Sequence, residues 1–253
     1  MKKWKTPLLL TLLIMGVLVV AAVVIGVLNA TVADGAITFG WTNYRYDGKG
    51  YQVGDGTVYG DAIERIDVDW LSGEVEIVAC EDASISLTEQ CQQELTDSAR
   101  VRWCVSEDGK TLTVKCRKSG WFFGKGGAEK KLILRIPVHM FSQLESLTVT
   151  SANADVAMYD IAVSNLKVSC KKGNVEWCSA YAPDVLEITA KDGNISLEIP
   201  EQTDFCLTWE SKRGNLSSDF PTVQEGNVYR VGDGTRAYRI VTPKGDLFLL
   251  AKK

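Results

Sequence analysis

Strand-length runs of alternating apolar and polar residues recur along the second half of the chain, and tight-turn signals separate them. The clearest example is the stretch 186–199, in which apolar residues occupy every second position on both sides of Asp192-Gly193-Asn194: Leu186, Ile188 and Ala190, then Ile195, Leu197 and Ile199. An alternation of period two predicts a half-buried strand, and Asp-Gly-Asn predicts a turn. The stretch is therefore expected to form strand, turn and strand.

The same phrase occurs six times when the turn residue is aligned with the first apolar residue before it. The aligned pairs are Ile66/Gly73, Leu147/Ala154, Leu166/Gly173, Leu186/Gly193, Leu207/Gly214 and Tyr238/Gly245. The four middle phrases begin 19, 20 and 21 residues apart. A period near 20 with two short strands per unit predicts an all-β, right-handed β-helix or solenoid-like stack. An antiparallel sandwich built from hairpins remains the alternative.

Stacking explains why such a short unit would be stable. One strand–turn–strand unit buries too little surface alone, whereas units stacked about 4.8 Å apart satisfy one another's backbone groups and form one apolar column. The turn glycine is expected to supply a positive φ. The predicted inward set is Leu147, Val149, Val156, Met158, Leu166, Val168, Cys170, Val175, Trp177, Leu186, Ile188, Ile195, Leu197, Leu207, Trp209, Leu216, Ile240, Leu247 and Leu249.

An earlier segment, 101–116, predicts a β-hairpin. Two alternating runs flank Asp108-Gly109, the favoured pair for a two-residue turn. One face would carry apolar residues into the core, among them Cys116, and Cys104 would be exposed on the other face beside Arg102.

The N-terminal segment has a different character. Residues 8–28 are 21 uncharged residues, long enough to cross a hydrocarbon core of about 30 Å as a helix. The lysines before it (Lys2, Lys3 and Lys5) favour a cytoplasmic N-terminus. We therefore predict a cytoplasmic tail at 1–7, a signal anchor at 8–28, a tether and entry segment at 29–61, and an extracytoplasmic repeat domain at 62–253. A cleaved signal peptide with a site at 31–33 is the alternative.

Charge and cysteine usage narrow the class of function. The net charge is −4, and it becomes −7 without the three N-terminal lysines because residues 1–28 contain no acid. An acidic exterior domain is a poor general ligand for nucleic acid, so no nucleic-acid partner is expected. The seven cysteines include no Cys-x-x-Cys, so they are interpreted mostly as small apolar core residues, with one or two disulfides left open.

The repeated phrases resemble those of a bacterial β-strand-repeat family of unknown function whose members are labelled "putative adhesin". The likeness lies in the phrases that end in Gly173-Asn-Val, Gly193-Asn-Ile, Gly214-Asn-Leu and Gly245-Asp-Leu, and in the strand end Arg135-Ile-Pro. It covers residues 62–250. The resemblance implies a right-handed β-helix-like domain on the cell surface and implies no reaction.

Residues for catalysis are sparse. His139 is the one histidine and follows a strand, which is typical of a surface loop, and no Gly-x-Ser-x-Gly occurs. Paired carboxylates could make a polysaccharide-active enzyme on a β-helix, but the acids occupy turns, as Asp192 and Asp246 do, or outward strand positions, as Glu74 and Glu76 do. We predict a non-enzymatic protein with no cofactor and no metal site.

The segment 115–131 breaks the period and carries the strongest signal of binding. It contains six cations and one acid in an otherwise acidic domain. The predicted docking loop comprises Trp121, Phe122, Phe123, Lys125, Arg117 and Lys118, and its target would be an anionic surface, an envelope polymer or a protein partner. Alternatively, the three aromatic residues fold back and cover the end of the apolar column.

Together these features predict a membrane-anchored, extracytoplasmic β-solenoid in the cell envelope that binds or scaffolds something there. Its partners would be the membrane, through the single-pass anchor, and an envelope polymer or protein. A polysaccharide-active enzyme and a sensory exterior domain of a membrane complex are the alternatives.

Overall fold

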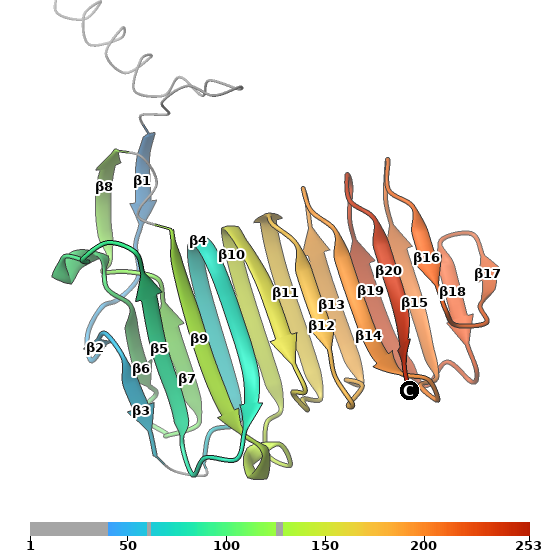
Figure 1. Cartoon of the computed structure of the whole chain (residues 1–253), viewed down its shortest axis with the longest axis horizontal. Helices are drawn as coiled ribbons and strands as arrows, with labels where there is room; N and C mark the ends of the chain where they lie inside the picture. Colours follow the sequence, from blue (N-terminus) through green and yellow to red (C-terminus); the bar gives the residue numbers. More distant parts are fainter. Residues whose placement is uncertain (1–39, 60–61, 125–128) are drawn as a thin grey trace, which may run out of the picture. The chain divides into compact units, whose positions relative to one another are not determined.

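The computed structural model describes residues 40–59, 62–124 and 129–253 (Figure 1). This part of the chain is all-β, and its only helices are two short 3-10 turns, η1 (Asp97–Ala99) and η2 (Val138–Met140). None of its helices has the length and apolar character needed to cross a membrane. The predicted anchor at 8–28 lies outside the described residues.

The chain divides into two compact units, residues 1–47 with 119–127, and residues 48–118 with 128–253. In the first unit, β1 (Gly40–Tyr44) pairs antiparallel with β8 (Gly120–Gly124), with Thr42 opposite Phe122. We call this pair the ribbon. Beyond it, the backbone N–H of Tyr46 donates a hydrogen bond to Oγ of Ser119 at 3.1 Å.

The second unit consists of two sheets joined by the same chain passes. In spatial order, the strands of the first sheet are β2 (Gln52–Val53), β6 (Arg102–Val105), β7 (Thr111–Lys115), the first half of β4 (Arg65–Cys80), the first half of β10 (Ser146–Tyr159), β11 (Asn165–Lys172), β13 (Val185–Ala190), β19 (Arg236–Val241), β15 (Phe205–Glu210), β18 (Val228–Val231) and β17 (Val223–Glu225). From β7 to β15 every pairing is parallel, and the strands at both ends pair antiparallel.

The second sheet follows the same order. Its strands are β3 (Gly56–Val58), β5 (Ile85–Cys91), β9 (Lys130–Pro137), the second halves of β4 and β10, β12 (Val175–Cys178), β14 (Ile195–Pro200), β20 (Leu247–Lys252) and β16 (Leu216–Ser218). Each pass through both sheets is one rung, and the residue between its two strands is the corner. Parallel stacking of rungs confirms the solenoid-like interpretation and contradicts the antiparallel sandwich.

The core lies between the sheets, where the inward residues of successive rungs stack. Of the predicted inward set, all residues are buried except two, Trp209 and Leu216, which are half-buried. Both belong to the rung of β15 and β16, which is outermost at its end of the stack. The Trp209 ring nitrogen, Nε1, donates a hydrogen bond to Oγ1 of Thr242 on the neighbouring rung at 3.0 Å.

The last two rungs are not stacked in the order of the chain. The C-terminal rung, β19 and β20, lies between the rung of β13 and β14 and the rung of β15 and β16 (Figure 1). The chain therefore completes the outermost rung first, forms the hairpin of β17 and β18, and then returns to place its last rung inside. This order is possible because a parallel strand can form the same ladder of backbone hydrogen bonds with whichever parallel strand lies beside it.

The corners need glycine for two different reasons. Gly73 and Gly173 have positive φ values, 99° and 126°, as predicted. The prediction is wrong for Gly193, Gly214 and Gly245, which have no positive φ. At these corners the reason is space, because a Cβ on Gly193 would lie 2.0 Å from the carbonyl oxygen of Gly173, and the other two are equally confined.

From the rung of β10 onward, the residue after the corner links neighbouring rungs through its side chain. Side-chain oxygens accept hydrogen bonds from the backbone N–H of the next rung, in the order Asp155 to Asn174 at 2.7 Å, Asn174 to Asn194 at 2.9 Å, Asn194 to Asp246 at 2.9 Å and Asp246 to Asn215 at 2.7 Å. This ladder explains why Asn or Asp recurs after the corner. It also follows the spatial order of the rungs rather than the order of the chain.

The predicted hairpin at 101–116 is confirmed as β6 and β7. Cys116 is buried as expected, but Cys104 is half-buried rather than exposed. The face is not open to solvent as predicted, since Arg102 on the same face is buried and donates a hydrogen bond to the Asp97 carboxylate of η1 at 2.8 Å. All seven cysteines lie in the described residues, and all are free thiols.

Replacing Gly193 by alanine tests the corner constraint. We expect Gly193→Ala to lower the free energy of unfolding by about 3 kcal/mol, because its Cβ would overlap backbone that cannot move alone. Gly226→Ala is the matched control, since Gly226 has φ 65° with nothing within 4 Å, so only the backbone cost of about 1 kcal/mol applies. Urea unfolding of both variants measures the difference, and equal losses would contradict the account.

Candidate functional site

The structure separates the predicted docking-loop residues between the two units. Trp121, Phe122 and Phe123 lie in β8, so they form a strand of the ribbon rather than a loop. Arg117 and Lys118 belong to the second unit, where the backbone N–H of Lys118 donates to the carbonyl of Ser98 at 3.2 Å. Lys125 lies outside the described residues. Neither docking nor coverage of the column is tested by this arrangement, so both stay predictions.

The position of this insertion in the repeat is clear. Residues 116–129 connect β7 to β9, which are the two strands of one rung on the outer side of β4. Lys130 is in register with Gly73, so the insertion stands where a corner would otherwise be. The chain therefore departs from its repeat in the row of corners.

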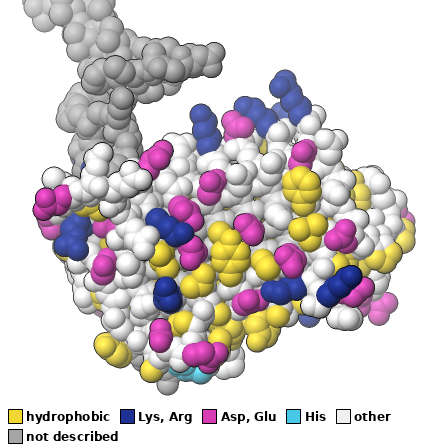
Figure 2. All heavy atoms as spheres, in the orientation of Figure 1, with side chains coloured by type: hydrophobic (Ala, Val, Ile, Leu, Met, Phe, Trp, Pro, Cys, Tyr) yellow, Lys and Arg dark blue, Asp and Glu magenta, His cyan; other side chains and the backbone are white. Residues whose placement is uncertain are grey.

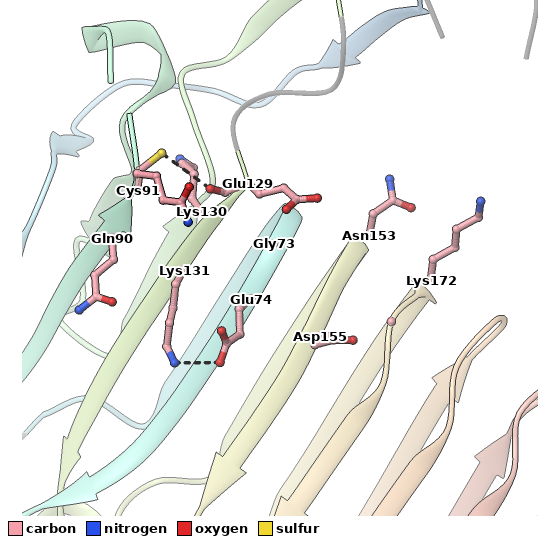
Figure 3. A pocket seen from close by; sticks show the side chains of 12 residues that line it. Gly73, Glu74, Gln90, Cys91, Glu129, Lys130, Lys131, Asn153, Asp155 and Lys172 are labelled. Atoms are coloured by element: carbon pink, nitrogen blue, oxygen red, sulfur yellow. Dashed lines mark hydrogen bonds and ion pairs between the residues drawn. The ribbon is translucent and has the colours of Figure 1, made fainter. Parts of the chain in front are cut away.

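An open groove of about 900 Å³ runs along the corner row next to this point (Figure 3). We call it the corner groove. Its lining is polar and of mixed charge: Gly73, Glu74, Gln90, Cys91, Gln92, Glu129, Lys130, Lys131, Asn153, Asp155, Lys172 and Gly173. Its side chains come from four rungs and from β5, so stacking of the rungs is what brings them together.

One wall of the corner groove contains a buried ion pair between Lys130 and Glu89. Each side chain is only 3% exposed. The ammonium also donates to the carbonyl of Ala99 at 2.7 Å and lies 4.8 Å from the centre of the Trp70 ring. The Glu89 carboxylate accepts the backbone N–H of Val101 at 3.1 Å. A buried ion pair whose other hydrogen bonds are also satisfied is structural. The Lys130 ammonium therefore has no donor left for a ligand.

The sequence interpretation counted Lys130 only as a cation of the docking loop. A signal for its burial was present, because Lys130 shares the period-two face of Leu132, Leu134 and Ile136, all of which are buried. A lysine on the inward face of a strand requires a buried partner. The partner, Glu89, lies on β5, whose antiparallel pairing with β9 the repeat pattern does not predict.

The second lysine of the groove, Lys131, is held by two carboxylates. Its ammonium contacts Glu74 at 2.8 Å and also pairs with Glu76. The hydrogen bonds that the ammonium donates to these two carboxylates raise the pKa of Lys131 above its ordinary value. The group is therefore protonated at neutral pH and is unsuited to act as a general base.

The other residues considered for chemistry do not converge. His139 is exposed on η2, which agrees with the interpretation as a surface residue. Glu74 and Glu76 project outward from β4, and Asp192 and Asp246 occupy the corner turns. Within the described ranges, no three His, Cys, Asp or Glu side chains are grouped so that they could hold a metal ion. Figure 2 shows acidic and basic side chains interspersed over the face in view, with no large patch of one sign.

Comparison with known proteins agrees with this architecture. Residues 63–185 match the model of the family described as Toastrack DUF4097. The predicted resemblance to a β-repeat family of unknown function labelled "putative adhesin" is thereby confirmed. The Toastrack match begins just before β4 and ends at the first residue of β13, so it includes the ion pair and the corner groove.

Two solved structures resemble this chain. The crystal structure of a putative cell adhesion protein from Clostridium sporogenes is 12% identical and aligns with a TM-score of 0.61, covering 80% of this chain and 100% of that one. At this identity the likeness shows the fold. A putative adhesin from Bacteroides fragilis is 13% identical over 80% of this chain and 98% of that one, with a TM-score of 0.35, which supports no structural conclusion. No curated protein matches the chain.

Changing one partner of the buried ion pair should be costly. We expect Glu89→Gln to lower the free energy of unfolding by about 3–5 kcal/mol, because it leaves the Lys130 ammonium buried without its counter-charge. The double variant Glu89→Leu with Lys130→Met should recover most of this loss, since no charge remains to be buried.

Glu74→Gln provides the matched control at the half-exposed pair with Lys131, where about 0.5 kcal/mol is expected. Urea unfolding curves measure all three variants. A Glu89→Gln protein as stable as Glu74→Gln would contradict the structural role of the buried pair.

Proposed function

We propose that this protein is a membrane-anchored, extracytoplasmic binding or scaffolding module of the cell envelope, without enzymatic activity. The predicted single-pass anchor at 8–28 would hold the chain in the membrane, and the solenoid, wound right-handed as parallel crossovers normally are, would stand outside the cell. A neighbour in fold is described as a cell adhesion protein, which agrees with a binding role.

The observation that carries the proposal is the pairing of the ribbon. Strand β1 follows the predicted anchor in the chain, and β8 contains Trp121, Phe122 and Phe123. Paired strands lie about 4.8 Å apart, so the backbone of the aromatic strand is held next to the segment that leaves the anchor. A strand rich in aromatic residues beside a membrane tether suits the boundary between headgroups and water, where tryptophan is enriched.

Basic residues of the same segment support this orientation. Arg117, Lys118 and Lys125 flank the aromatic strand in sequence, and each cation near an anionic leaflet contributes about 1 kcal/mol of attraction. In this proposal the target of the predicted docking loop is the lipid headgroups of the membrane. Envelope polymers and proteins would be bound elsewhere on the solenoid.

The chemistry of the corner groove supports a non-enzymatic role. Two of its three lysines are paired with carboxylates, Lys130 with Glu89 and Lys131 with Glu74 and Glu76. A polysaccharide-active site requires a carboxylate or lysine whose proton can be exchanged with substrate. Pairing removes Lys130, Lys131 and their carboxylate partners from such a role and so supports a binding or scaffolding surface.

The anchor and its orientation can be tested together in cells. The full chain should remain in the membrane pellet after alkaline carbonate extraction, and protease added to spheroplasts should digest residues 62–253. A variant with Leu18→Arg and Val19→Arg within the predicted span is the control and should be lost from the pellet, because charges at the centre of the span oppose insertion. Extraction of the unaltered chain by carbonate, or protection from protease in intact spheroplasts, would contradict the proposal.

A further inference from the structure

A second hollow lies on the return loops, which carry the chain from the second sheet back to the first. These loops comprise residues 160–164, 179–184 and 201–204. The hollow, of about 470 Å³, is lined by loop residues together with Phe141 and Arg236. We call it the return-loop hollow. It belongs to the second unit and takes no part in the corner groove or the ribbon.

Small residues create the space. Ala162 and Ala182 occupy equivalent positions of neighbouring rungs, since Asn165 is in register with Val185. Buried Ser179 holds the loop in place, because its Oγ donates to the carbonyl of Ile161 at 2.9 Å and accepts the backbone N–H of Tyr181 at 3.0 Å. The backbone at Tyr181 is thus fixed before any ligand arrives, which lowers the entropic cost of binding.

Aromatic rings form one side of the hollow. Tyr181 is 49% exposed and packs against Phe141 edge to face, with ring centres 5.8 Å apart. Half of a large aromatic side chain is therefore left in contact with water over a preformed hollow. The exposed part of the Tyr181 ring is thereby available to contact the apolar face of a ligand in the hollow.

Paired charges and an amide form the other side. Nε of Arg236 lies 3.8 Å from Oδ1 of Asp184, too far for a hydrogen bond, and Nε itself makes none. The Asp184 side chain is 72% exposed and that of Arg236 is 33% exposed, while Gln202 is exposed beside them. These three side chains offer donors and acceptors of hydrogen bonds, and their formal charges sum to zero.

We propose that the return-loop hollow binds a neutral hexopyranose oligosaccharide. A pyranose ring has a C–H face that can lie on an exposed aromatic ring, and its edge carries adjacent hydroxyl groups that both donate and accept. Tyr181 provides the apolar face, and Asp184, Arg236 and Gln202 provide partners for the hydroxyls. The lining contains one acid and one base, so it offers no net attraction to an anionic sugar. This site deepens the proposed function, on which it rests, by naming a ligand class for the envelope module.

The test uses the full chain in lipid nanodiscs and saturation-transfer NMR titrations with maltohexaose, cellohexaose and chitohexaose, and with hexagalacturonate as the anionic comparison. At least one neutral oligosaccharide should bind, and Tyr181→Ala should weaken it about tenfold or more. Asp184→Ala should also lower the affinity for the same oligosaccharide. Tyr59→Ala is the matched control, because Tyr59 is 82% exposed and lies outside the hollow. The affinity of this variant for the oligosaccharide should be unchanged.

Unaltered thermal unfolding of Tyr181→Ala would establish that the loss is local. The proposal is overturned when none of the neutral oligosaccharides binds at about 10 mM, when Tyr181→Ala binds as the unaltered chain does, or when only hexagalacturonate binds. Carbonate extraction and protease digestion of the same variants separate the two hypotheses: a chain that is anchored and exposed but binds no sugar retains the proposed function and lacks this site.

Discussion

The rest of this structure depends on how closely the backbones of neighbouring rungs approach at the corner. At Gly245 a Cβ would lie 1.7 Å from the carbonyl oxygen of Gly193, and at Gly214 it would lie 1.8 Å from that of Gly245. Because no side chain fits at these glycines, the corners form one column of backbone, in which Ala154 contributes the only Cβ among the six aligned corners. The Asn and Asp side chains that follow the corners then satisfy the amides of the next rung. Register in both sheets follows from this column, since a slip of one residue would turn every inward side chain outward.

Because the rungs are fixed in this way, the segments that depart from the repeat lie at the ends of the strands. The corner row is interrupted once, where residues 116–129 replace a corner and contribute β8 to the ribbon. The loops on the return side carry the hollow around Tyr181. The outer faces of the sheets instead carry ion pairs, such as Lys167 with Glu187 at 3.0 Å, which contribute little to stability. Binding is therefore proposed at the two rows of turns.

The sequence predicted the rungs because their physics is local and periodic. Apolar alternation and the turn glycines identified all six corners and nearly the whole inward set, and the half-buried Trp209 and Leu216 differ only because their rung is outermost. The order of the last two rungs could not be predicted in this way. Leu207 and Tyr238 occupy the same inward position of their rungs, so periodicity does not distinguish an intercalated rung from a sequential one.

The candidate sites were less accessible to sequence reasoning because they depend on contacts between distant segments. Lys130 could be recognised as a charged residue on the inward, apolar face of its strand. Its partner Glu89 could not be predicted, because Glu89 lies on an antiparallel strand outside the repeat. Tyr181 and Arg236 are 55 residues apart and meet only because the C-terminal rung is intercalated. The aromatic residues of β8 were singled out by composition, and their pairing with β1 could not be seen from either segment alone.

Disulfide trapping across the second sheet tests the intercalated rung most directly. Outward residues Ser196 and Ser217 both pair with Phe248, one on each side. Oxidation of a Ser217→Cys, Phe248→Cys chain should therefore form the corresponding disulfide, identified by peptide mapping, because paired residues lie within the span of an S–S bond. A Ser196→Cys, Ser217→Cys chain should form none, since a strand separates the two positions. Efficient crosslinking of that second pair, with none in the first, would contradict the account.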